Sequence, residues 1–231
     1  MMGIWDDLLD VGTALGNGIY SVGEDIVLGI ERSAEGLGVR GSERIAQIGR
    51  ENDLLVKLIT DLFRYGVTAA ESPLYKIISK ILLKYYSSFP EEALRKLAKG
   101  AAIGGAYTAG RMVIGKALAT AIAKRIAQKI ALSAAYKQIS KKLGVSAGAG
   151  ATGIGIPITL LMIQGVAQRS SDASMRLKAL DPQLHRELRA ANGLDMLYFL
   201  VEKPMQKHMK AIVAARRNPK AFENAAKEKY K

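Results

Sequence analysis

The sequence predicts an all-α protein, a helical bundle with a central apolar segment rich in glycine and alanine. Three observations favour this fold class. Apolar side chains recur at helical spacing along much of the chain, the six prolines act as punctuation between segments, and small residues are abundant while aromatic residues make up only 6%. With 231 residues, 49% of them apolar and 24% charged, the chain can bury a sizeable core and is not intrinsically disordered.

Local signals predict where the first helices begin. Apolar side chains at helical spacing predict a helix or a pair of helices from Ser42 to about Tyr65. Ser72 followed by Pro73 is typical of an N-cap and a first helical position, so we expect the next helix to begin there. The apolar stripe of that helix consists of Leu74, Ile77, Ile78, Ile81, Leu82 and Tyr85.

A second start signal and a long helical tract follow. Glu91 and Glu92 come directly after Pro90, and negative charge is favourable in the first turn of a helix. Beyond them, apolar residues recur every four positions from Leu118 to Ile130. The lysines and arginines of this tract would each cost about 3 kcal/mol at the centre of a bilayer, so we expect an amphipathic helix and not a transmembrane one.

The C-terminal part of the chain carries three further signals. Asp181 and Pro182 predict a short helix that ends at Asn192–Gly193, a pair that favours a left-handed stop. The apolar run over residues 194–200 predicts a core segment. Asn218–Pro219 predicts a break that divides the basic tail into two pieces.

Charge divides the chain into two regions. Residues 1–53 hold 10 acidic and 4 basic side chains, a net charge of −6, whereas residues 54–231 hold 11 acidic and 30 basic ones, a net charge of +19; together they give the formal +13 of the chain. We expect an acidic, glycine-rich N-terminal region at 1–53 and a basic, helical, membrane-active domain at 54–231, or one single domain in which the acidic region folds back on the basic body. A basic surface of this size attracts the phosphates of anionic lipid or nucleic acid.

The most informative stretch is residues 143–168, between Lys142 and Arg169, which carries no charge. As a helix its 26 residues would reach roughly 39 Å, against roughly 30 Å for the hydrocarbon core of a bilayer. Its glycines and its proline weaken insertion, so we expect the protein to be soluble first and membrane-bound later. The residues expected to insert or to pack helices closely are Gly144, Gly148, Gly150, Gly153, Gly155, Pro157, Leu160 and Leu161, with Gly100, Gly104 and Gly110 upstream.

Polar and basic residues complete the expected membrane site. The candidate pore-lining residues are Thr152, Thr159 and Gln164. The expected contacts to lipid headgroups are Lys76, Lys80, Lys84, Lys142 and Arg169. The alternatives are a solvated lysine face on a bundle helix, and small residues that pack helices inside a soluble protein.

The sequence offers little for catalysis. Residues 148–153 match G-x-G-x-x-G, but no strand pattern precedes them, and residues 110–116 match the start of a phosphate loop but continue with Ala117, which has no hydroxyl. His185 and His208 are expected at the surface among basic neighbours. Cysteine is absent, and no carboxylate pair or cluster with metal-ligand spacing stands out. We therefore expect no enzyme, no cofactor and no metal.

The glycine and alanine blocks Ser146–Gly155 and Ala101–Gly115, the absence of cysteine and an acidic start unlike a Sec signal support a family resemblance. The chain resembles the small pore-forming antibacterial toxins, particularly the ion-conducting effectors of the type VI secretion system. The resemblance implies a toxin that is stored in the cytoplasm of its producer, neutralised by a cognate immunity protein, and secreted without a Sec signal through a secretion-machinery component or chaperone. Such a toxin inserts into the inner membrane of a target cell, forms a homo-oligomer in the bilayer and dissipates ion gradients.

Two other functions remain open on the sequence alone. One is a soluble, basic helical protein that binds nucleic acid, although its cations are scattered and few aromatic residues interleave them for base stacking. The other is a holin-like or single-span membrane protein.

Overall fold

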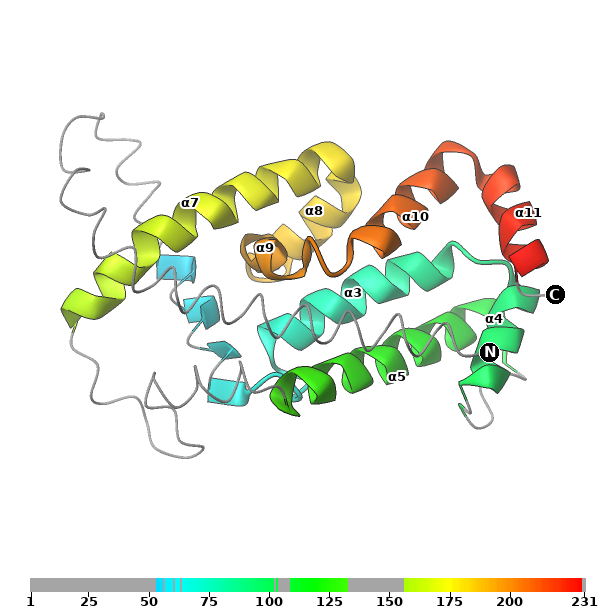
Figure 1. Cartoon of the computed structure of the whole chain (residues 1–231), viewed down its shortest axis with the longest axis horizontal. Helices are drawn as coiled ribbons and strands as arrows, with labels where there is room; N and C mark the ends of the chain where they lie inside the picture. Colours follow the sequence, from blue (N-terminus) through cyan, green and yellow to red (C-terminus); the bar gives the residue numbers. More distant parts are fainter. Residues whose placement is uncertain are drawn as a thin grey trace.

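The computed structural model describes residues 53–132, apart from 56, 60, 63, 102 and 104–108, and residues 156–229; of residues 156–165, 168 and 229 it describes only the backbone. Within these ranges every regular element is a helix, which confirms the all-α fold class. Residues 53–65 are helical wherever they are described. The remaining elements pack on a core that runs from Leu55 to Ala226 (Figure 1).

Helix α3 (Pro73–Ser87) lies at the centre of the bundle and contacts α5, α8, η2, α9 and α10. It begins at Pro73, as predicted, but Ser72 forms no side-chain cap; its carbonyl oxygen instead accepts the Lys76 amide at 3.0 Å. The predicted stripe is buried except at its end, where Tyr86 is 4% exposed and Tyr85 only half-buried. In the last turn of the helix, the buried position is therefore Tyr86, one residue after the predicted Tyr85.

Helix α4 (Glu91–Gly100) starts directly after Pro90, which occupies the N-cap position. Glu91 accepts a hydrogen bond from Arg95 Nε at 3.0 Å, and Glu92 forms an ion pair with Lys96 at 3.6 Å. Each glutamate of the first turn therefore pairs with a basic residue four positions later. The start signal predicted from the sequence is confirmed.

Helix α5 (Arg111–Leu132) packs antiparallel on α3 and lies along the lower side of Figure 1. Bulky side chains alternate with small ones on its buried face, which comprises Ile114, Gly115, Leu118, Ala119, Ile122, Ala123, Ile126, Ala127 and Ile130. A Cβ added at Gly115 would lie 3.8 Å from the Cβ of Tyr86, so the two helices are in close contact there. The cations of α5 lie on its exposed side, and the predicted amphipathic helix is confirmed.

Helices α7 (Ile156–Leu180) and α8 (Pro182–Ala190) form a sharp corner at Asp181. The Asp181 carboxylate accepts the Leu184 amide at 3.0 Å, so this residue is the N-cap of α8. The chain leaves α8 through Asn192 (φ 60°) and Gly193 (φ 72°), both left-handed, as predicted.

The C-terminal part covers the opposite side of α3 from α5 (Figure 1). It consists of the 3₁₀-helix η2 (Leu194–Leu197), α9 (Tyr198–Val201), α10 (Gln206–Arg217) and α11 (Pro219–Lys229). The apolar run 194–200 is core, as predicted, with Phe199 only half-buried. Asn218 separates α10 from α11 and accepts the Ala221 amide at 3.1 Å, which confirms the predicted break.

Candidate functional site

The uncharged segment enters the described structure through α7. Of the residues singled out in the sequence, those that lie outside the described residues are Gly104, Lys142, Gly144, Gly148, Gly150, Thr152, Gly153 and Gly155. Those whose backbone lies in the first half of α7 are Pro157, Thr159, Leu160, Leu161 and Gln164. Pro157 is in the first turn of α7, where a missing amide hydrogen costs no intrahelical bond.

Helix α7 has two halves of different composition. Residues 156–168 belong to the uncharged segment, and at about 1.5 Å per residue they span about 20 Å. In Figure 1 this half extends along the long axis of the molecule beyond the first turn of α3. Among the described residues, no helix combines the length and the apolar character that a membrane span requires.

The second half of α7 is fixed to the rest of the bundle by its buried side chains. These are Ser170, Ala173, Ser174 and Leu177, and Val166 near the end of the uncharged half is buried as well. The Ser170 hydroxyl donates to the carbonyl oxygen of Met196 in η2. The Arg176 guanidinium donates twice to Glu202, at 2.7 Å each, and this pairing raises the pKa of Arg176. The uncharged half is therefore attached to a firmly packed half of the same helix.

Arg169 stands at the boundary between the two halves. Its side chain is exposed, and its guanidinium carbon lies 5.9 Å from the centroid of the Phe199 ring, within range of a cation–π contact. The charge expected at a headgroup therefore lies directly after the uncharged residues.

A buried polar cluster joins α7, α8 and η2. The Ser174 hydroxyl donates to Asp195 Oδ2 at 2.7 Å and lies 3.2 Å from His185 Nε2. Arg189 donates to the same carboxylate oxygen from Nε and Nη2, at 3.0 and 2.8 Å. His185 is 7% exposed, so the expectation of a surface histidine is wrong: it lies on the inner face of α8 beside Leu184 and packs against α7 and η2.

Serine, histidine and aspartate occur together in this cluster, but their arrangement is not that of a nucleophilic triad. In a triad the serine and the aspartate contact opposite nitrogens of the imidazole. Here Ser174 and Asp195 both lie close to Nε2 of His185, at 3.2 and 3.6 Å, and the serine hydroxyl donates its hydrogen bond to the carboxylate of Asp195 and not to the imidazole. Burial lowers the pKa of His185, so the neutral ring is favoured. The geometry suits a structural hydrogen-bond network.

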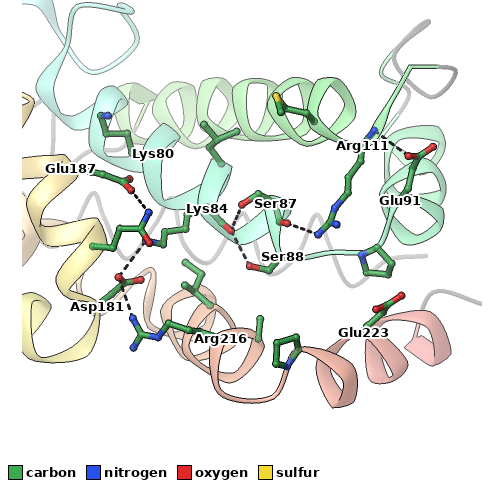
Figure 2. A pocket seen from close by; sticks show the side chains of 17 residues that line it. Lys80, Lys84, Ser87, Ser88, Glu91, Arg111, Asp181, Glu187, Arg216 and Glu223 are labelled. Carbon is green, nitrogen blue, oxygen red and sulfur yellow. Dashed lines mark hydrogen bonds and ion pairs between the residues drawn. The ribbon is translucent and has the colours of Figure 1, made fainter.

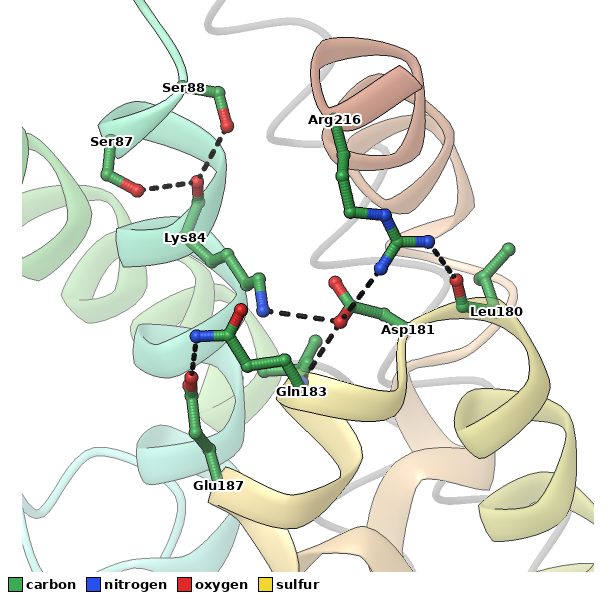
Figure 3. A network of polar contacts seen from close by, with 9 residues as sticks. Lys84, Ser87, Ser88, Leu180, Asp181, Gln183, Glu187 and Arg216 are labelled. Carbon is green, nitrogen blue, oxygen red and sulfur yellow. Dashed lines mark hydrogen bonds and ion pairs between the residues drawn. The ribbon is translucent and has the colours of Figure 1, made fainter.

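A second polar network, the Asp181 junction, holds the α7–α8 corner against α3 and α10 (Figure 3). The Asp181 carboxylate is fully buried and pairs through Oδ1 with Lys84 Nζ at 3.3 Å and with Arg216 Nη1 at 3.4 Å. Arg216 also donates from Nη2 to the carbonyl oxygen of Leu180 at 2.9 Å. Lys84, expected at a lipid headgroup, is only 19% exposed and holds helices together in this structure.

An open groove lies beside this junction, between α3, α8, α10, α11 and the first turn of α5 (Figure 2). Its volume is about 980 Å³. Its charged lining residues are Lys80, Lys84, Arg111, Arg216, Glu91, Asp181, Glu187 and Glu223. Four cations thus face four carboxylates, so the groove has no strong net charge. Lys80 lies half-buried in it, whereas Lys76 lies outside it and is exposed.

Several charged groups of this groove are engaged with the protein itself. Arg111 Nη2 donates to the carbonyl oxygen of Ser87 at 2.7 Å, and the hydrogen bond from Arg95 lowers the pKa of Glu91. Glu223 pairs with Lys227 at 2.8 Å. No group of three acidic or histidine side chains in the described ranges could hold a metal ion.

Two of the glycines predicted to pack helices do not do so here. A Cβ added at Gly100 or Gly110 would meet no atom within 4 Å. The glycine of α5 that lies against α3 is Gly115, beside Tyr86, and the alanines that follow it every four residues are buried. The reason is that Gly100 ends α4 and Gly110 precedes α5, so neither lies within a helix–helix contact.

No family model, curated protein or solved structure matches the chain. The Asp181 junction and the buried cluster were not predicted from the sequence, because their residues are far apart along the chain. Lys84 and Asp181 are separated by 97 residues, and Ser174 and Asp195 by 21. For Asp181 the sequence did carry a local signal, the N-cap pattern Asp181–Pro182. That pattern predicted the start of α8 but not the pairing of Asp181 with Lys84 and Arg216.

Proposed function

We propose that this protein is a pore-forming antibacterial toxin that inserts residues 143–168 into the inner membrane of a target cell and dissipates ion gradients. The observation that carries the proposal is the uncharged stretch itself, 26 residues between Lys142 and Arg169 in a chain with a net charge of +13. As a continuous helix it is long enough to cross a bilayer, and both flanking cations would reach the headgroups.

The two halves of α7 support this proposal. The second half is held by Ser170, Ser174 and Arg176, while the first half is composed of uncharged residues. A helix built in this way can keep its charged half on a folded body at the membrane surface while its apolar half enters the bilayer. Insertion then requires residues 143–155 to extend the helix, with Thr152, Thr159 and Gln164 as the candidate lining of the pore.

The partners follow from the same proposal. A toxin that inserts on its own would harm its producer, so we expect a cognate immunity protein that keeps the segment from the membrane. We expect export without a Sec signal through a secretion-machinery component or chaperone. Assembly of the pore would use the small residues of the segment, above all Gly148 and Gly153, as close contacts between copies.

A charge placed within the segment tests insertion directly. Leu161→Lys should oppose insertion by about 3 to 4 kcal/mol and reduce dye release from anionic vesicles more than 100-fold. Met175→Lys is the matched control, since it adds the same charge to the packed half of α7 at a side chain that is 60% exposed, and it should leave release within about twofold of wild type. Equal release by wild type and Leu161→Lys would refute the proposal.

The pore itself is tested by conductance. Gly148→Leu together with Gly153→Leu should remove currents in planar bilayers while binding to vesicles persists, because the larger side chains separate the helices without adding charge. Unchanged currents would refute assembly through these glycines. Resistance of the freshly made protein to carbonate extraction would favour a permanent membrane protein instead.

A further inference from the structure

The outer face of α5 combines features that fit a lipid surface. The helix has five basic residues and no acidic residue in 22 positions. A row of exposed side chains four residues apart runs along it: Lys116, Thr120, Lys124, Gln128 and Leu132. Arg125 and Lys129 extend the positive charge on the same exposed side.

Large apolar side chains stand at the two ends of this face: Val113 precedes the row and Leu132 is its last member. Val113 is 57% exposed at the start of the helix and Leu132 is 70% exposed at its end. They are about 29 Å apart along the axis. Together with the cations between them, these two side chains fit a partner that is apolar below and anionic above.

The other acid-free helices are less suited to such contact. On α3, Lys84 is held by Asp181 and Lys80 is half-buried in the groove. On α10, Arg216 is held by Asp181 and by the Leu180 carbonyl, and the exposed Lys210 and Arg217 have no exposed large apolar side chain beside them on that helix. Helix α5 also lies along one side of the bundle, with α3 between it and α10 (Figure 1).

We propose that the exposed face of α5, defined by Val113, Lys116, Lys124, Lys129 and Leu132, is the surface that docks this protein on an anionic bilayer. The proposal rests on the membrane function proposed above and adds the site of first contact, which the sequence analysis placed on Lys76, Lys80 and Lys84 of α3 and on Lys142 and Arg169. The cations bind lipid phosphates, and the two apolar side chains enter the region just below the headgroups. A membrane fits better than nucleic acid, because the face presents aliphatic side chains and no aromatic ring for base stacking.

The experiment measures binding of the full chain to vesicles of equal parts phosphatidylglycerol and phosphatidylcholine, by cosedimentation. The docking variant changes Lys116, Lys124 and Lys129 to glutamine. Each lysine near an anionic surface contributes about fivefold to binding, so we expect a loss on the order of 100-fold. The matched control changes Lys203, Lys210 and Lys220, also exposed, to glutamine; it alters the net charge equally and should bind within a few fold of wild type.

A second readout reports the position of the helix in the bilayer. Because the chain has no cysteine, Leu132→Cys gives a single site for an environment-sensitive fluorophore. Its emission should shift to the blue on anionic vesicles and not on pure phosphatidylcholine, whereas a label at Lys220→Cys on α11 should not shift.

Each outcome decides the proposal. Equal loss of binding in both triple variants would mean that only the net charge matters, and it would overturn the α5 face while leaving the membrane function intact. Retardation of duplex DNA by wild type, lost in the docking variant, without vesicle binding would overturn it in favour of nucleic acid. If Leu161→Lys releases dye like wild type but the docking variant does not bind, insertion of residues 143–168 fails and the docking face stands.

Discussion

The Asp181 junction should make a measurable contribution to the stability of the fold. Asp181→Asn keeps an oxygen that can accept the Leu184 amide, since asparagine caps helices about as well as aspartate, but it removes the charge that pairs with Lys84 and Arg216. Removal of one partner of a fully buried pair costs about 3 to 5 kcal/mol. Lys84 remains 19% exposed and Arg216 49% exposed, and both can recover part of their hydration, so we expect a loss of about 2 kcal/mol.

Urea denaturation combined with a double-mutant cycle isolates this contribution. Asp181→Asn should lower the free energy of unfolding by about 2 kcal/mol and the melting temperature by roughly 4 to 8 °C. In the cycle with Lys84→Met, the coupling energy should be about 1 to 2 kcal/mol. The matched control is Lys76→Met on the same helix, where the lysine is exposed and the coupling with Asp181→Asn should be near zero. Coupling energies of equal size for Lys76 and Lys84 would refute the reasoning.

Two further predictions concern the backbone and the buried cluster. In a urea titration, Gly193→Ala should destabilise the fold by about 1 to 3 kcal/mol, because Gly193 has φ +72° and an added Cβ would lie 2.3 Å from a methyl carbon of Leu54. The control is Gly100→Ala, which should be neutral or stabilising because an added Cβ there would have no atom within 4 Å. Burial lowers the pKa of His185, so below about pH 6.5 the unfolded chain binds the proton more readily than the folded one and stability falls. His185→Gln should reduce the drop in urea midpoint between about pH 7.5 and 5.5. An undiminished drop would mean that protonation of His185 does not cause the loss of stability.

Helix boundaries were predictable because their signals are local. Pro73 fixes the backbone at the first position of α3 and Pro90 fixes it at the N-cap of α4, and Asp181 supplies an oxygen to an amide only three residues away. Asn218 does the same at the start of α11. Each of these signals operates within one turn, so a sequence pattern is enough to locate it.

Long-range polar contacts could not be predicted in this way. Lys76, Lys80 and Lys84 share one spacing and one residue type in the sequence, yet the fold leaves the first exposed, half-buries the second and pairs the third with a carboxylate. Which of the three meets Asp181 depends on how the α7–α8 corner lies against α3. The burial of His185 has the same origin, because the side chains that surround it come from α7 and η2.

The candidate membrane site was predictable only in part. The absence of charge over residues 143–168 is a property of the sequence, and the structure adds that its second part begins a helix whose other half is packed in the bundle. The exposure of Val113 and Leu132 was not predictable, since the same helix buries most of its other aliphatic residues and the sequence does not state which face meets α3.

Membrane potential in living bacteria tests the central claim most directly. The chain would be expressed with and without an added export signal, and a potential-sensitive dye would be followed after induction. We expect rapid depolarisation when the exported wild-type chain reaches the inner membrane, none with exported Leu161→Lys, and protection by the immunity partner once it is identified. A stable potential in cells that export the intact wild-type chain would contradict it.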